Sequence, residues 1–331
     1  MGSDPIALPL LNWLAGEARA VAQVVAVFTQ PDRAAGRGQQ VQSGAIKVWA
    51  LAHGLPVHQP AKLGADDLAA LRSHAPEVVL IMAYGHILRD NFIAVPRLGM
   101  LNLHTSLLPK YRGASPIQTA IACGEKTTAV TLMRIVAELD AGPVAGQEAV
   151  AIDPLDTAVE VEAKLAQACV PLLARTLPEL AAGRLAFREQ DAAAATFCRR
   201  LEKSDGRLDF AASAAELAAR INGLFPWPAA TTELNGQAVK LGLADTVPPE
   251  TCHVISDTFG KPGAVLGAEA GGLLVATGQG VLRLRKLQRP GGKMLPAAEF
   301  LRGFPVAPGS VLRSLPMAPL VARFPFPRKP A

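Results

Sequence analysis

The sequence predicts an α/β domain with a Rossmann-like, doubly wound and mostly parallel sheet, followed by a small OB-like β-barrel domain. Through the first two hundred residues, strand-like and helix-like segments alternate, which is typical of a parallel sheet covered by helices. Short strand-like segments separated by glycine turns follow, as in small barrels. A chain of 331 residues is long enough for two such domains.

The first domain is expected to cover residues 1–187. Its strands are expected where apolar runs occur, and its helices where apolar residues recur with helical spacing. The expected strands are 21–29, 77–82, 100–104 and 129–135, and the expected helices are 43–53, 116–122 and 157–177. Ser115 and Pro116 suit the cap and the first position of the second of these helices.

The beginning of this domain is unusual. Residues 2–5 look like a loop that follows a first strand, and residues 5–14 look like the helix after it, but no strand-forming residues precede Gly2. The first strand of a doubly wound sheet is central, so its absence would expose backbone groups of its neighbours. Either the start of the sequence is placed too late or a central strand has been lost. The first interpretation is favoured.

The second half of the chain is expected to contain a linker, a barrel and a tail. The linker covers residues 188–204, which are alanine-rich and irregular, and the barrel covers residues 205–313. One helix is expected at 214–223, and the barrel strands are expected at 231–234, 238–244, 263–266, 273–277 and 281–288. The proline-rich tail, residues 314–331, is expected to be loosely attached.

Composition narrows the class of protein. Hydrophobic residues make up 50% of the chain and charged residues 18%, so a sizeable core can form. The four cysteines form no CxxC pair, which argues against a zinc site or a disulfide framework and fits a reducing cytoplasm. No apolar run is long enough to cross a bilayer, and no signal peptide is recognisable. The prediction is therefore a cytoplasmic protein with no metal and no membrane partner.

The positive charge lies late in the chain. Residues 201–331 carry 15 Lys+Arg against 10 Asp+Glu, whereas residues 1–200 carry 18 of each. A basic C-terminal region suits a polyanion such as nucleic acid, although a modest excess that keeps the protein soluble is an equally good explanation.

The most informative segment is residues 102–113, which read Asn-Leu-His-Thr-Ser-Leu-Leu-Pro-Lys-Tyr-Arg-Gly. It begins as a strand and ends as a turn. Because side chains alternate along a strand, Asn102 and His104 point to one face. An amide donor and a titratable imidazole therefore lie together at the end of a strand, where open α/β sheets bind ligands.

This segment resembles the signature of the enzymes that transfer a formyl group from 10-formyltetrahydrofolate. The resemblance implies a trio in which Asn102 binds the oxyanion, His104 handles protons and Asp140 holds the imidazole. Asp140 lies in Leu-Asp-Ala-Gly, which is similar to the family's Leu-Asp-x-Gly. Taken alone, Asp140 would be read as a turn residue.

The resemblance also implies a folate site. In the family, Ser-Leu-Leu-Pro lines the pterin pocket, and these residues are Ser106, Leu107, Leu108 and Pro109 in this chain. A neighbouring wall is expected at residues 83–88, with Tyr84, Gly85 and Ile87 as its binding residues. The expected co-substrate is 10-formyltetrahydrofolate.

Two further matches indicate methionyl-tRNA formyltransferases within this family. Residues 30–38 resemble their Gln-Pro-Asp-Arg-x-x-Gly-Arg-Gly loop, although Gln39-Gln40 stands where the family often has a basic pair. Segments at 203–209, 225–230, 233–236 and 288–293 resemble their junction and tRNA-binding barrel. The implied tRNA contacts are Arg33, Arg37, Lys110, Arg112, Arg283, Arg285 and Lys293, and the partner is methionyl initiator tRNA, bound by a monomer.

Two alternatives remain open. A formyltransferase that acts on a nucleotide-linked amino sugar would share the chemistry and a small second domain. A tRNA-binding homologue with impaired catalysis would keep the basic surface, and the absent first strand is the feature that favours it.

Overall fold

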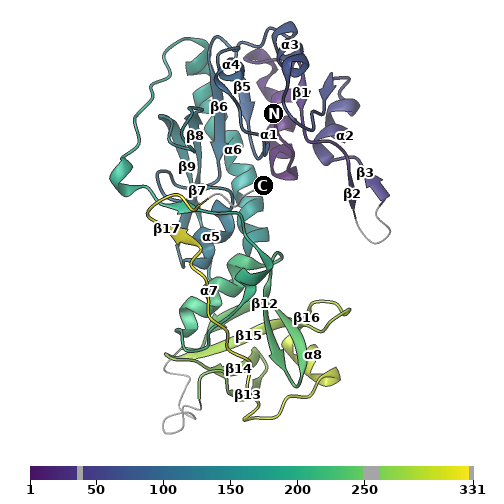
Figure 1. The fold of residues 1–331 in the computed structure, drawn as a ribbon, viewed down its shortest axis with the longest axis vertical. Coiled ribbons are helices and arrows are strands. Elements are labelled where there is room, and N and C mark those ends of the chain that lie inside the picture. The colour runs from purple at the N-terminus through teal and green to yellow at the C-terminus, as the bar shows by residue number, and fades with distance from the viewer. Residues whose placement is uncertain (36–39, 249–260, 328–331) are drawn as a thin grey trace. The chain divides into compact units, whose positions relative to one another are not determined.

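The computed structural model describes residues 1–35, 40–248 and 261–327 (Figure 1). The chain forms two compact units. Unit 1 contains residues 1–112, 129–150 and 162–195, and unit 2 contains residues 113–128, 151–161 and 196–331. Each unit is described by itself below.

The main sheet of unit 1 has the strand order β5-β6-β8-β9. β5 and β6 are parallel, with Ile81 opposite Asn102, and β8 runs antiparallel to β6. A separate parallel pair joins β1 to β4, and β2 forms a hairpin with β3. The α/β class is thus confirmed, with a mixed sheet. The strands are β1 Val27–Phe28, β2 Arg33–Ala35, β3 Gln40–Gln42, β4 Val57–His58, β5 Val79–Ile81, β6 Met100–His104, β7 Arg112–Gly113, β8 Thr127–Arg134 and β9 Val144–Ala151.

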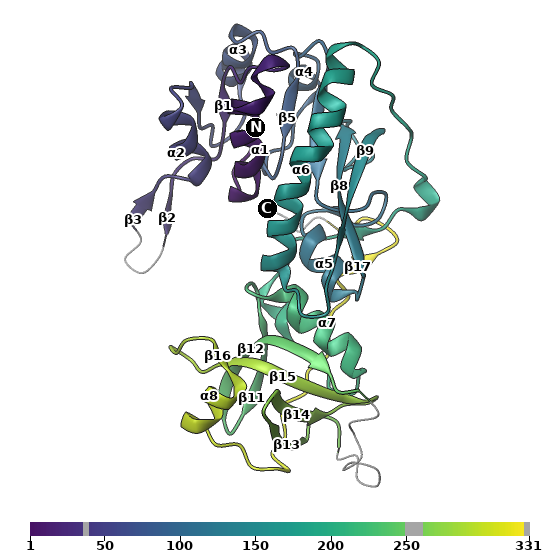
Figure 2. The ribbon, with the colours of Figure 1, turned by 180° about the vertical axis from the view of Figure 1, so that it is seen from behind.

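Helices cover this sheet, and α6 runs along one face of it in Figure 2. Leu165, Leu172 and Leu173 of α6 are fully buried, and Cys169 lies against Met82 beyond the end of β5. The expected helix at 116–122 matches α5, although Ser115 makes no capping bond through its side chain. The helices of the first half are η1 Pro5–Ala7, α1 Leu8–Ala15, η2 Glu17–Ala20, α2 Ala45–Ala52, α3 Ala65–Ser73, α4 Asp90–Ile93, α5 Pro116–Ala122 and α6 Ala158–Ala181.

Met1 and Gly2 lie between β1 and β5 and pair with both. The Gly2 amide donates to the carbonyl of Phe28 at 3.0 Å, and the Met82 amide donates to that of Met1 at 3.0 Å. The Met1 amine donates to the carbonyl of Leu80 at 2.6 Å. Two residues at the N-terminus therefore form a short parallel connection where a central strand was expected.

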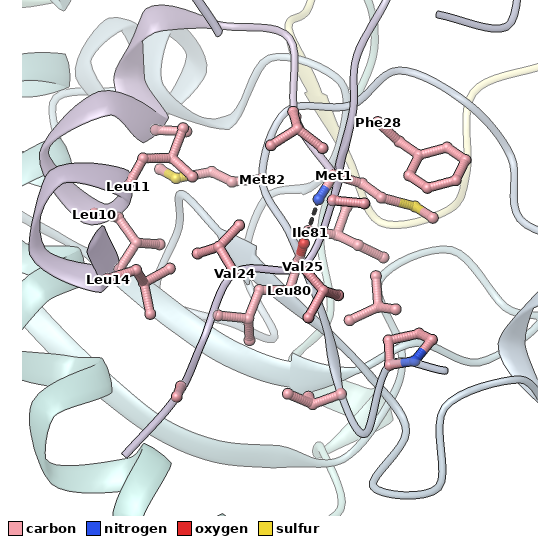
Figure 3. A pocket seen from close by; sticks show the side chains of 18 of the residues that line it. Met1, Leu10, Leu11, Leu14, Val24, Val25, Phe28, Leu80, Ile81 and Met82 are labelled. Atoms are coloured by element: carbon pink, nitrogen blue, oxygen red, sulfur yellow. Dashed lines mark hydrogen bonds between the residues drawn. The ribbon is translucent and has the colours of Figure 1, made fainter. Parts of the chain in front are cut away.

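Beside this connection lies a cavity of about 150 Å³ (Figure 3). Its walls come from α1, from residues 22–28 and from residues 78–82, and they are mostly aliphatic. The expected strand at 21–29 is regular only at β1, and Val21 and Val25 are 44% and 42% exposed. Among the described residues, no backbone hydrogen bond is recorded for residues 24–26. This segment lacks a partner on its cavity side, which explains why β1 is so short.

Unit 2 contains a sheet with the order β11-β12-β15-β14-β13, in which each neighbouring pair is antiparallel. Residues 309–313 lie between its two ends, because the Leu312 amide donates to Gly263 and the Arg313 amide donates to Glu233. The sheet is thereby closed, as a small barrel requires. The elements are η3 Ala192–Ala194, β10 Phe197–Cys198, η4 Lys203–Gly206, α7 Ala214–Leu224, β11 Ala230–Leu234, β12 Gln237–Thr246, β13 Val265–Glu269, β14 Gly272–Ala276, β15 Val281–Gln288, β16 Leu295–Pro296, α8 Ala297–Gly303 and β17 Val321–Ala322.

The expectation of a loosely attached tail is wrong for its described part, residues 314–327. Leu320 is 5% exposed, and β17 pairs antiparallel with β10. The amide of Leu315 also donates to the carbonyl of Leu208 at 2.7 Å. A two-residue strand, one buried side chain and single backbone contacts hold this part of the tail, and such short features leave no periodic pattern in the sequence.

Candidate active site

Strand β6 brings Asn102 and His104 to one face of the main sheet of unit 1. The strand covers Met100–His104, the bounds expected from the sequence. Leu101 and Leu103, which alternate with these two residues along β6, are buried on the opposite face. His104 is 6% exposed, whereas Asn102 is more open. The period of two along the strand thus separates the polar face from the core.

The imidazole of His104 lies between a backbone carbonyl and a carboxylate. Its Nε2 is 3.0 Å from the carbonyl oxygen of Tyr111. Because a carbonyl can only accept, Nε2 carries the hydrogen of this bond. Nδ1 faces the Oδ2 of Asp140 at 3.7 Å, an ion pair whenever the ring is protonated. The structure therefore brings together His104 and Asp140 as the sequence suggested, and adds the Tyr111 carbonyl, which no side-chain pattern could reveal.

The loop that carries Asp140 is held in an unusual backbone conformation. Asp140 has φ of 47°, in the left-handed region that non-glycine residues seldom occupy. At Gly142 an added Cβ would lie 1.9 Å from the carbonyl oxygen of Arg134, so only glycine fits there. The Arg134 amide donates to the carbonyl of Pro143 at 3.0 Å. These contacts fix the direction in which the Asp140 carboxylate points.

Arg112, expected at the tRNA surface, has its guanidinium inside unit 1. It is 6% exposed, and its Nε and Nη2 donate to the side-chain oxygen of Gln190 at 3.1 and 2.8 Å. Burial lowers the pKa of Arg112, and the negative charges of Asp140 and Glu138 oppose this shift. The side chain therefore presents its charge to the Asp140 loop rather than to solvent. Lys110, by contrast, is exposed.

The turn after β6 is fixed by internal hydrogen bonds. Ser106 is fully buried, and its hydroxyl donates to the carbonyl of Lys110 at 2.7 Å. Thr131 donates to the Ser106 carbonyl at 2.6 Å, and Gln147 donates to the Leu108 carbonyl at 2.9 Å. Leu108 is buried, Pro109 is half-buried and Leu107 is 38% exposed. Leu107 is thus the apolar side chain of this turn that remains open to a ligand.

Residues 83–88 are the second wall expected for the folate site. Here too, backbone groups are held by hydrogen bonds while one apolar side chain is open. The carbonyl of Tyr84 accepts from Gln30 at 3.1 Å, while its ring is 2% exposed. Burial raises the pKa of Tyr84, so its phenol stays neutral. Gly85 has φ of 78°, and Ile87 is 78% exposed. None of the seven residues expected to bind folate lines the cavity of Figure 3.

The loop that contains Arg33 is anchored by Asp32. Its carboxylate accepts from Lys47 at 2.6 Å, from Gln59 at 2.9 Å and from Ser43 at 3.2 Å. The hydrogen bond from Lys47 is the main cause that lowers the pKa of Asp32. Arg33 is exposed, with its Nη2 2.8 Å from Gln30 Oε1. Arg37 lies outside the described residues.

In unit 2, the cations expected to bind tRNA differ in their surroundings. Arg283 and Arg285 lie on one face of β15, as alternation predicts, and both donate to Asp245 at 2.7 Å. Arg283 also pairs with Glu269 at 2.8 Å, and the hydrogen bonds to Asp245 and Glu269 raise its pKa. Lys293 is exposed. The two arginines are therefore already balanced by carboxylates.

Within the described part of the chain, no three His, Cys, Asp or Glu side chains gather as metal ligands. The same residues contain no helix that is both long enough and apolar enough to cross a membrane. The His104–Asp140 pair can supply acid–base chemistry, and the side-chain amide of Asn102 on the same strand can donate a hydrogen bond.

The fold and the site define an α/β enzyme with an imidazole–carboxylate pair at the end of a sheet strand, joined to a β-rich unit. Two family models match the chain: "Formyl transferase" over residues 8–177 and "Formyl transferase, C-terminal domain" over residues 200–305. The chain belongs to the formyl transferase family.

Curated relatives share much of the sequence. Methionyl-tRNA formyltransferase of Ectopseudomonas mendocina is 41% identical over 88% of this chain and 90% of its own length. The enzyme of the same name from Methylococcus capsulatus is 38% identical over 92% of this chain and 96% of its own. A crystallised sugar 3N-formyl transferase has the same fold, with a TM-score of 0.63 and 17% identity over 87% of this chain and 95% of its own.

Proposed function

We propose that this protein transfers the formyl group of 10-formyltetrahydrofolate to the α-amino group of methionyl initiator tRNA. The observation that carries this proposal is the His104–Asp140 pair beside Asn102 on β6. Relatives about 40% identical that are named methionyl-tRNA formyltransferases support the choice of acceptor. The resemblance of residues 30–38 and of the C-terminal unit to that family supports it further.

The reaction joins an amine to the formyl carbon and releases the folate nitrogen. The neutral α-amine attacks the formyl carbon, and the carbonyl oxygen becomes an oxyanion, to which the Asn102 amide donates. His104 takes the amine's proton at Nδ1, and Asp140 stabilises the resulting imidazolium. The C–N bond to the folate then breaks, and His104 returns the proton to the leaving nitrogen. Protons and charges balance without a metal.

The folate is proposed to lie against residues 106–109 and residues 84–87. Leu107 and Ile87 offer exposed apolar surface for the pterin, and Gly85 has no side chain to hinder a ring that approaches its backbone. The tRNA is proposed to contact Arg33, Arg37, Lys110 and Lys293. The protein is proposed to act as a cytoplasmic monomer, and light scattering at micromolar concentration tests its oligomeric state.

The decisive experiment supplies purified protein with 10-formyltetrahydrofolate and three acceptors. These are methionyl initiator tRNA, uncharged initiator tRNA and a nucleotide-linked amino sugar. Formyl-methionyl-tRNA should accumulate with the first acceptor alone. Turnover of the amino sugar without the tRNA would make the sugar the acceptor. Binding of tRNA without turnover would identify an impaired homologue.

A further inference from the structure

Gln190 uses both ends of its side-chain amide on groups beside Asp140. Its oxygen accepts from Nε and Nη2 of Arg112, at 3.1 and 2.8 Å. Its nitrogen donates to the carbonyls of Asp140 and Gly142, both at 2.8 Å. One amide thus joins a buried cation to the two ends of the turn that presents the catalytic carboxylate.

The segment that carries Gln190 is itself held in place. Arg188 and Val144 exchange two backbone hydrogen bonds, at 2.7 and 2.9 Å. The segment that follows α6 therefore runs beside β9 at this point. The guanidinium of Arg134 lies 4.2 Å from the ring centroid of Phe187 in the same segment. Gln190 therefore approaches the Asp140 loop from a fixed backbone, which is what a positioning residue needs.

The chemistry of an amide suits this place better than that of other side chains. The oxygen must accept from a cation, and the nitrogen must donate to two carbonyls, as only Gln and Asn can do with one group. A carboxylate would pair with Arg112 but would turn an oxygen toward two carbonyl oxygens. An aliphatic side chain would leave the guanidinium of Arg112 without this acceptor and both carbonyls without this donor.

We propose that Gln190 is a positioning residue for the reaction, which aligns the Asp140 carboxylate with Nδ1 of His104. Gln190 stabilises the left-handed turn at Asp140 by donating to its carbonyls, and the close contact of Gly142 with the Arg134 carbonyl restricts the same turn sterically. Arg112 completes the support by placing positive charge near Asp140. The proposal rests on the proposed function, because Gln190 acts through Asp140 and His104.

The test compares Gln190→Leu and Gln190→Glu with the neighbouring exposed variant Glu189→Leu. We expect both Gln190 variants to lower kcat by roughly 10- to 100-fold, because a displacement of about 1 Å at a catalytic group has effects of that size. KM for either substrate should stay within about threefold, since neither substrate contacts Gln190 in the proposed arrangement. Glu189→Leu should behave as wild type. A Gln190→Glu enzyme with wild-type kcat would overturn the proposal, because it would show that pairing with Arg112 is sufficient.

A second measurement reports on the pair without turnover. Nitrogen-15 NMR should show a shifted Nδ1 signal of the His104 ring in Gln190→Leu, as it should in Asp140→Asn, because the carboxylate that faces Nδ1 is displaced or lost. Combining Gln190→Leu with Asp140→Asn should add no further loss of kcat. Additive losses of kcat, or an Nδ1 signal that is unchanged in Gln190→Leu, would rule out action through Asp140. This readout stands even if the acceptor is not tRNA.

Discussion

The Nε2–H of His104 donates to the carbonyl of Tyr111 at 3.0 Å, which leaves Nδ1 as the nitrogen that faces Asp140. The two ring nitrogens therefore have separate tasks. The backbone carbonyl orients the ring, and the carboxylate stabilises the charge that the ring gains. Tyr111 has φ of 61°, so the direction of its carbonyl depends on a left-handed residue at the end of the turn.

Asp140→Asn should slow the enzyme without weakening substrate binding. The asparagine keeps the size of the side chain but removes the charge that stabilises the imidazolium. We expect kcat to fall by about 10²- to 10⁴-fold, the usual range for losing acid–base assistance, with KM little changed. Single-turnover formylation of methionyl-tRNA measures this, and His104→Ala is the matched comparison. A variant with full kcat would remove Asp140 from the chemistry.

The sequence predicts much of this site because its elements are local. Strand β6 could be located to the residue, since a short apolar strand with two polar residues on one face leaves little choice. Asp140 could be proposed because its motif is contiguous. The support from Gln190 could not, because it joins residues about fifty positions apart through side-chain orientation, and residues 188–204 carry no periodic signal.

The strand expected at residues 21–29 shows a different limit of prediction from the sequence. Its valines favour a strand, but a strand also needs partners for its backbone. Among the described residues of this segment, the sheet partners lie at β1 and Thr29, from β4 on one side, and at Phe28, from Gly2 on the other. The same dependence on partners explains the tail, in which Leu320 and β17 are ordered by contacts that no sequence pattern announces.

In a chain produced with Met1 as its first residue, the buried Met1 amine should make stability depend on pH between 5 and 8. Burial lowers the pKa of this amine from 8.0 to about 5, so the folded state holds it neutral where the unfolded state protonates it. Stability should therefore fall as pH drops from 8 toward 5, by at most about 4 kcal/mol. Urea unfolding at several pH values measures this. An N-acetylated protein, which keeps the N–H donor to Leu80, should lose that part of the slope. An unchanged slope would show that the amine is not desolvated.

Filling the cavity beside Met1 should stabilise unit 1. An extension of five residues rich in Val and Ile, placed before Met1, can pair with the open backbone of residues 24–26 and replace the cavity. A cavity of about 150 Å³ corresponds to roughly 3–4 kcal/mol of stability. A Ser/Gly extension of equal length is the control, because it also removes the amine. If both extensions raise Tm equally, the gain does not come from filling the cavity.

Asp205 should be a strong determinant of stability in unit 2. It is fully buried and accepts from Nη1 and Nη2 of Arg199 at 2.8 and 2.6 Å, and from the Glu202 amide at 2.7 Å. Burial alone would raise the pKa of Asp205, but these hydrogen bonds and the positive charges lower it overall. Asp205→Ala should cost about 3–5 kcal/mol, because it leaves Arg199 without its buried partner.

The pH dependence of that loss has a definite sign. Because the pKa of Asp205 is lowered on folding, its contribution is complete above the unfolded pKa of about 4 and disappears as pH falls below it. Denaturant titrations at pH 7 and pH 3 should therefore show a large difference between wild type and Asp205→Asn at pH 7 and a smaller one at pH 3. Equal differences at both pH values would contradict the ionised pair.

Lys293 and Arg283 should affect tRNA use in different ways. Lys293 is exposed, so Lys293→Ala should lower the slope of log kcat/KM against log salt by about one, as expected for one phosphate contact. Arg283 is 18% exposed and bonded to Asp245 and Glu269, so its positive charge is already balanced. Arg283→Ala should leave the salt slope nearly unchanged and cost about 1–3 kcal/mol of stability, because it removes charged hydrogen bonds. Kinetics with methionyl-tRNA from 50 to 300 mM salt measure the salt slope, and thermal unfolding measures the change in stability. A large change of slope in Arg283→Ala would show that tRNA displaces the carboxylate partners of Arg283.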